Sequence, residues 1–134
     1  MPANRFALTR RHALSAVAGA LMALSIAAPA AAQTFPAKPI TFVVPFAAGS
    51  ATDQLARAIG QSITNDTKQA VVVDNKAGAS GMIAAAAVAK AAPDGHTILI
   101  TTNTTHAANE HLYKKLSYDP VKDFVPVTGL GKGG

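Results

Sequence analysis

The most restrictive feature of the sequence is a continuous run of β-branched and aromatic residues, ITFVVPF, at residues 40–46. A strand with one face in water alternates apolar and polar side chains, whereas this run is apolar at nearly every position. Continuous hydrophobicity is typical of a parallel strand that is covered on both faces. The run therefore favours an α/β fold.

Segments that suit helices and strands alternate after this run. Residues 51–65 carry apolar side chains at helical spacing, and residues 71–73 are three valines typical of a short strand. An alanine-rich helix is expected at residues 81–92 and a third strand at residues 97–101. The apolar stripe of the first helix is formed by Leu55, Ala56, Ile59 and Ile63. This alternation predicts an α/β lobe with a parallel-rich sheet and flanking helices.

Residues 1–32 have the three parts of a secretory signal peptide. An arginine-bearing start is followed by a small, apolar stretch at residues 13–28 and then by Ala30-Ala31-Ala32 before Gln33. The apolar stretch is shorter and less hydrophobic than a segment that spans a bilayer, so a permanent anchor is disfavoured. We expect cleavage near Ala32 and export to the periplasm.

The route of export is left open by the sequence. Arg10-Arg11 resembles a twin-arginine signal, and an ordinary positive start of a signal peptide is the alternative.

Composition narrows the classes of partner and chemistry. The chain has 12 Lys and Arg against 7 Asp and Glu. Three arginines lie in the predicted signal peptide, and the remaining basic residues form no cluster. With few aromatic residues and no Trp, nucleic-acid binding is disfavoured. The absence of cysteine excludes disulfides, thiolate metal ligands and a cysteine nucleophile.

The sequence contains only incomplete versions of the motifs for catalysis, cofactor binding and metal binding. A dinucleotide site needs three glycines at fixed spacing, and the loop after the first strand supplies one. Ser80 lacks the last glycine of a nucleophile elbow, and His106 and His111 would be separated by about 140° on a helix. We therefore expect no enzyme activity, no cofactor and no metal, with a fragment of an α/β enzyme as an alternative.

Two loops are the candidate binding site, because ligands of open α/β sheets sit outside the carboxyl ends of the strands. The first joins a strand to a helix start, where free N–H groups and the helix dipole attract an anion such as a carboxylate. The second is a dense run of hydrogen-bonding side chains. The candidate residues are Phe46, Ala47, Ala48, Gly49, Ser50 and Asp53 in the first region and Thr102, Asn103, Thr104, Thr105 and His106 in the second. A plain turn at Gly49-Ser50 is the alternative for the first loop.

Several segments of the chain match those of one known family in sequence, order and spacing. The segments PAKPI at 36–40 and VPFAAGSATD at 44–53 resemble the opening of Bug-type proteins, the extracytoplasmic substrate-binding subunits of tripartite tricarboxylate transporters. Further matching segments are 71–79, 88–95, 105–107, 112–116 and 118–124. The resemblance runs from Pro36 to Thr128.

The resemblance implies a two-lobed, periplasmic-binding-protein-like α/β fold that closes over a small carboxylate and works with the membrane subunits of a transporter. We expect the protein to be a monomer. It places the family's binding loops at residues 46–50 with Asp53 and at residues 102–106. One departure is Gly49-Ser50, where the family usually has two glycines, and another is Ala77 in place of proline.

The length of the chain gives the expected domain organisation. Bug-type proteins are much longer and have a second lobe, and residues 129–134 no longer resemble them. We therefore expect a signal peptide at 1–32, the N-terminal part of the first lobe at 33–128 and an atypical, truncated end at 129–134. A secreted sensory or scaffold module is the alternative to a transport function.

Overall fold

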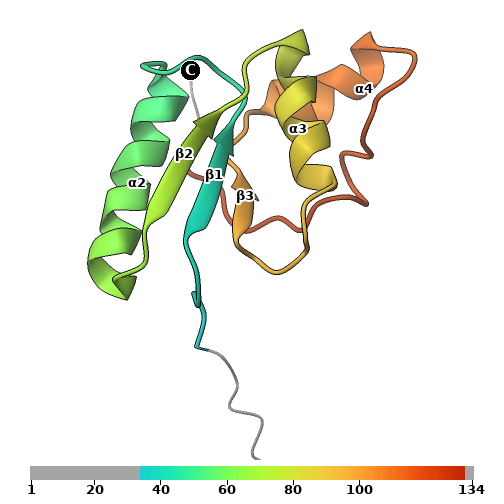
Figure 1. Cartoon of the computed structure of the whole chain (residues 1–134). Coiled ribbons are helices and arrows are strands. Elements are labelled where there is room, and N and C mark those ends of the chain that lie inside the picture. The colour runs from blue at the N-terminus through green and yellow to red at the C-terminus, as the bar shows by residue number, and fades with distance from the viewer. Residues whose placement is uncertain (1–33, 132–134) are drawn as a thin grey trace, which may run out of the picture. The chain divides into compact units, whose positions relative to one another are not determined.

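The run of apolar residues that dominates the sequence forms the central strand of a parallel sheet (Figure 1). The computed structural model describes residues 34–131, so the predicted signal peptide and its cleavage site lie outside the described residues. Within that part the strands are β1 (Ile40–Val44), β2 (Val71–Asn75) and β3 (Thr97–Leu99), in the order β2-β1-β3. Both neighbours run parallel to β1, which confirms the predicted sheet.

The register of the sheet brings the ends of its strands to one edge. Val44 lies opposite Asn75, and Val43 lies opposite Leu99. The first residues beyond β2 and β3 still bond to β1, since the N–H of Lys76 donates to Val44 over 2.8 Å and the N–H of Ile100 donates to Val43 over 3.0 Å. We call this edge, with the loops that leave it, the carboxyl edge.

Helix α2 (Ala51–Thr67) packs against one face of the sheet. Its first turn is capped by Ser50, whose Oγ accepts from the N–H of Asp53 over 3.2 Å, and its end is marked by Lys68 in the left-handed conformation. Ala56 is fully buried in one cluster with Phe42 and Val44. The helix begins where the sequence predicts.

One residue of the predicted apolar stripe does not face the sheet. Ala56 is buried and Ile59 and Ile63 are packed against the core, but Leu55 is 42% exposed. Because Leu55 precedes Ala56, its side chain is turned by about 100° around the helix axis. The stripe is therefore narrower than predicted.

Helix α3 (Met82–Ala89) packs against the other face, where Val43, Ala84 and Ala85 are buried outside the cluster that includes α2. It begins one residue later than predicted because Gly81, the last residue of the short turn η2 (Ala79–Gly81), has a φ of 83°. A right-handed helix cannot include that conformation. The helix ends at Ala89, three residues earlier than predicted, so its end is not set directly by Pro93.

After β3 the chain forms a short π-helical turn, η3 (Thr104–Ala108), followed by α4 (Asn109–Leu112). The third strand is shorter than predicted, since β3 ends at Leu99. Among residues 34–131, no helix has the length and hydrophobicity needed to cross a bilayer.

Candidate functional site

Both predicted binding loops leave the carboxyl edge of the sheet (Figure 1). Residues 46–50 connect β1 to α2, and residues 102–106 follow β3, which lies directly beside β1. A third loop, residues 76–81, leaves the same edge from β2. The parallel sheet thus places the two predicted loops on adjacent strands.

Asp53 fixes the first loop through hydrogen bonds of its carboxylate. Its carboxylate is buried, with 2% of the residue exposed, and Oδ2 accepts from Arg57 Nε over 3.0 Å and from the N–H of Gly49 over 2.8 Å. Oδ1 accepts from Asn75 Nδ2 over 2.9 Å. The bond from Arg57, then those from Gly49 and Asn75, lower the pKa of Asp53 to about 2. Asp53 is therefore ionised at neutral pH and fully engaged within the protein.

Asn75, which the sequence analysis did not single out, is the second residue that fixes this loop. It is the last residue of β2, and its Nδ2 donates to the Phe46 carbonyl over 3.1 Å as well as to Asp53. Its position at the carboxyl end of a strand is the signal that could have found it. Asn75 and Asp53 together hold both ends of the 46–50 loop.

The pKa of Asp53 predicts a pH dependence of stability. A carboxyl group whose pKa is lower in the folded than in the unfolded state stabilises the fold above its unfolded value, near 3.9, and loses that contribution as pH falls through the folded value. We expect the free energy of unfolding to fall between about pH 4 and pH 2, the folded pKa of Asp53 being about 2. Urea unfolding at several pH values measures it.

The matched variant for this prediction is Asp53→Asn, which keeps the shape of the side chain. The hydrogen bond from Lys38, then that from the N–H of His96, lower the pKa of Asp94 to about 2 as well, so the wild-type protein and the variant share that part of the acid dependence. The variant should be less stable at neutral pH and lose less stability in acid. Identical acid dependence in both proteins would contradict the role given to Asp53.

The second loop presents two different surfaces. Asn103 and Thr104 are exposed, whereas Thr105 is 1% exposed and faces the interior. His106 is half-buried with its ring 4.7 Å from that of Phe124, and burial lowers its pKa, so the ring is neutral at pH 7. Thr102 Oγ1 and His106 Nδ1 are buried and have no hydrogen-bond partner among the described residues. The outward donors of this loop are thus Asn103 and Thr104.

Backbone donors are also available in the first loop. The N–H of Gly49 is used by Asp53 and that of Ser50 donates to the Ala47 carbonyl over 3.2 Å. Within residues 34–131, the N–H groups of Ala47 and Ala48 form no hydrogen bond, and both residues are exposed. Together the loops offer neutral donors and no free carboxylate, an arrangement that suits an anion.

Comparison with known proteins identifies the family of this chain. A family model described as the tripartite tricarboxylate transporter family receptor matches residues 55–133. This chain belongs to that receptor family. The sequence resemblance is thereby confirmed, and the family is one of receptors.

Relatives of this receptor support the assignment along most of the chain. BugT from Bordetella pertussis is 41% identical over 120 residues, a match that covers 88% of this chain and 37% of BugT. MatC from Rhodopseudomonas palustris, solved with bound malate, is 46% identical with a TM-score of 0.65 and covers 69% of this chain and 32% of MatC. An R. palustris protein solved with adipate is 44% identical with a TM-score of 0.62, covering 64% and 29%. The receptor chain thus spans about a third of these relatives.

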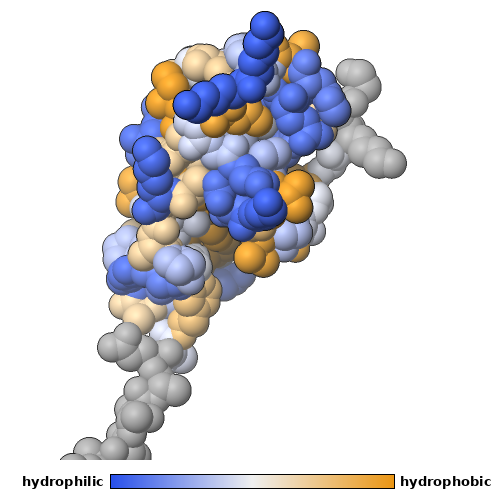
Figure 2. All heavy atoms as spheres, turned by 90° about the vertical axis from the view of Figure 1, so that its right-hand side faces the viewer, coloured by the Kyte–Doolittle hydropathy of each residue, from blue (hydrophilic) through white to orange (hydrophobic). Residues whose placement is uncertain are grey.

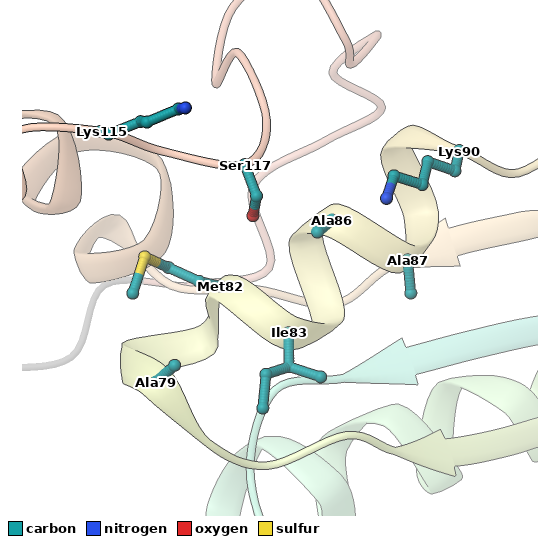
Figure 3. Close-up of a pocket in the computed structure, with 8 residues that line it drawn as sticks. All are labelled: Ala79, Met82, Ile83, Ala86, Ala87, Lys90, Lys115 and Ser117. Carbon is teal, nitrogen blue, oxygen red and sulfur yellow. The ribbon is translucent and has the colours of Figure 1, made fainter.

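A groove of about 540 Å³ in the receptor lies apart from the candidate residues. It lies beside α3 and is lined by Met82, Ile83 and Ala86 of that helix, together with Lys90 and with Lys115 from the chain after α4 (Figure 3). Figure 2 shows the side of the molecule that carries α3 and α4, where hydrophilic and hydrophobic side chains are interspersed. None of the predicted site residues lines the groove.

Proposed function

We propose that this receptor is an extracytoplasmic solute-binding protein that captures a small carboxylate for a tripartite tricarboxylate-type transporter. The observation that carries the proposal is the placement of two donor-bearing loops on the adjacent strands β1 and β3, at the carboxyl edge of a parallel sheet. Its relative MatC is solved with malate, and another relative is solved with adipate. Both of these ligands are small dicarboxylates.

In this proposal the ligand is bound by exposed donors of both loops. A carboxylate group of the ligand accepts hydrogen bonds from the N–H groups of Ala47 and Ala48 and from the side chains of Asn103 and Thr104. His106, with its neutral ring, adds a polar contact that brings no further charge.

Asp53 serves this site indirectly. Its carboxylate accepts three hydrogen bonds, one of them from the cation of Arg57, so its negative charge is balanced within the protein. That balance permits an anionic ligand close by, which an unpaired carboxylate would repel. We therefore assign Asp53 the role of fixing the 46–50 loop.

The same proposal places the mature protein in the periplasm and gives it the membrane subunits of a transporter as partners. The sequence of residues 1–32 supports export, because it has the organisation of a signal peptide. Membership in a transporter receptor family supports the partnership.

We expect Thr104→Val to weaken carboxylate binding by about tenfold or more, because a hydrogen bond to a charged group contributes roughly 1.5–3 kcal/mol. Thr104 is exposed, so the substitution removes a donor with little change in shape or packing. Titration calorimetry of the whole receptor with malate and adipate measures the change. Thr67 is the last residue of α2, at the end of the helix away from the 46–50 loop. Thr67→Val is therefore the matched control and should bind as the wild type does. Equal affinity in the Thr104 variant would remove that residue from the site.

A further inference from the structure

The loop that leaves β2 has an unusual backbone. Four consecutive residues have positive φ values, which are 129° at Gly78, 47° at Ala79, 52° at Ser80 and 83° at Gly81. Glycine adopts this conformation readily, but for Ala79 and Ser80 it is unfavourable. A conformation of this kind persists only where surrounding contacts impose it.

The contacts that impose it come from the chain after β3. The Ser80 carbonyl accepts a hydrogen bond from Asn109 Nδ2 over 2.9 Å and a longer one from Thr105 Oγ1 over 3.5 Å. The Ser80 hydroxyl is 2.9 Å from the hydroxyl of Tyr113, in an exposed contact. Of these partners, Asn109 makes the short bond from a fully buried side chain.

Asn109 also belongs to a buried polar junction beneath the second loop. Its Nδ2 lies 3.4 Å from the hydroxyl of Tyr118, and that hydroxyl donates to the Thr105 carbonyl. Asn109, Thr105 and Tyr118 are all buried. One amide therefore joins the turn after β2 to the backbone of the loop after β3.

The turn is in addition packed between the two proposed binding loops. A Cβ on Gly81 would clash with Thr105 Oγ1 and come within 3.2 Å of Pro45 Cβ. Pro45 directly precedes residues 46–50, and Thr105 lies in residues 102–106. Gly81 is therefore closely packed against one residue of the second loop and against the residue that precedes the first.

We propose that Asn109 is a positioning residue, which holds the 78–81 turn in its left-handed conformation and through it sets the placement of the 102–106 loop. It acts on the site through the Ser80 carbonyl and the Tyr118–Thr105 contact rather than by touching the ligand. The structural part of the proposal stands on these contacts, and its effect on affinity rests on the proposed function.

The first test uses the unmodified chain and needs no substitution. The side-chain amide protons of Asn109 should exchange with solvent at least about a hundredfold more slowly than those of the exposed Asn65, as measured by NMR. Equally fast exchange at both residues would overturn the proposal.

The second test compares Asn109→Leu with Tyr113→Phe, which removes the exposed contact to the same turn. In Asn109→Leu, backbone amide exchange at residues 79–82 and 104–106 should accelerate by about tenfold or more, while exchange in β1 and α2 changes by less than about twofold. Tyr113→Phe should leave both regions near the wild-type rates. Uniform acceleration throughout Asn109→Leu, or none at all, would contradict a positioning role.

Ligand affinity of the whole receptor separates this proposal from the proposed function. We expect malate or adipate to bind Asn109→Leu at least about fivefold more weakly than the wild type, with Tyr113→Phe unchanged. If the wild type binds a carboxylate and Asn109→Leu binds it equally well, the positioning role is wrong. If the wild type binds neither ligand while the exchange results hold, the proposed function fails and the structural role of Asn109 stands.

Discussion

Replacing Gly81 by alanine should destabilise the chain by about 2–5 kcal/mol. Its φ of 83° is unfavourable for any residue with a Cβ, at a cost of roughly 1–2 kcal/mol. The added methyl group would also clash with Thr105 Oγ1 and crowd Pro45, and overpacking of this kind costs about 1–3 kcal/mol. Urea unfolding followed by circular dichroism measures the sum.

Gly49→Ala is the matched control for this substitution. Gly49 has almost the same φ, 85°, but nothing lies within 4 Å of the position that its Cβ would occupy. It should therefore show only the backbone cost of about 1–2 kcal/mol. If Gly81→Ala is no more destabilising than Gly49→Ala, the close packing of the 78–81 turn against Thr105 and Pro45 is wrong.

Phe42→Ala should cost about 3–5 kcal/mol, the usual range for removing a buried aromatic ring. Phe42 is 2% exposed at the centre of β1 and packs in the cluster that includes Ala56 of α2. Its loss leaves a cavity beneath the helix whose first turn supports the 46–50 loop. Denaturant unfolding of the purified chain is again the measurement.

Val72→Ala is the control for the core substitution, because Val72 lies on β2 with 52% of its surface exposed. A surface change of this kind should alter stability by about 0.5 kcal/mol or less. Comparable losses in the two variants would show that Phe42 is not the centre of the core.

The sheet could be predicted because its signals are local. An uninterrupted apolar run, three valines and a helical stripe each identify one element, and the alternation of elements then requires parallel strands. The start of α2 also has a local signal that the apolar spacing did not use, since Ser50 and Asp53 have the spacing of a helix cap. The carboxyl edge followed from the topology alone.

The contacts that fix the loops could not be read from the sequence, because each joins residues distant along the chain. Asn75 reaches Phe46 and Asp53 from another strand, and Asn109 reaches Ser80 from beyond β3. The left-handed turn at Ala79 and Ser80 has no local signal either, as neither residue type favours that conformation. The start of α3 was predicted one residue early because Gly81, where the helix was expected to begin, also has a positive φ.

The second loop was predicted as a uniform set of donors, and the structure divides it. Asn103 and Thr104 face outward, while Thr105 is buried beside Gly81 and interacts with Ser80. A run of similar polar residues gives no indication of which side chains face the interior, because that depends on the curvature of η3. The five residues nevertheless lie at the edge where they were expected.

The central claim is that the two loops on β1 and β3 bind one carboxylate ligand, and a crystal structure of the whole receptor with bound malate or adipate tests it most directly. We expect a ligand carboxylate within hydrogen-bonding distance of the N–H of Ala47 or Ala48 and of the Thr104 hydroxyl. A ligand bound away from the carboxyl edge, for example in the groove bordered by Lys90 and Lys115, would contradict it.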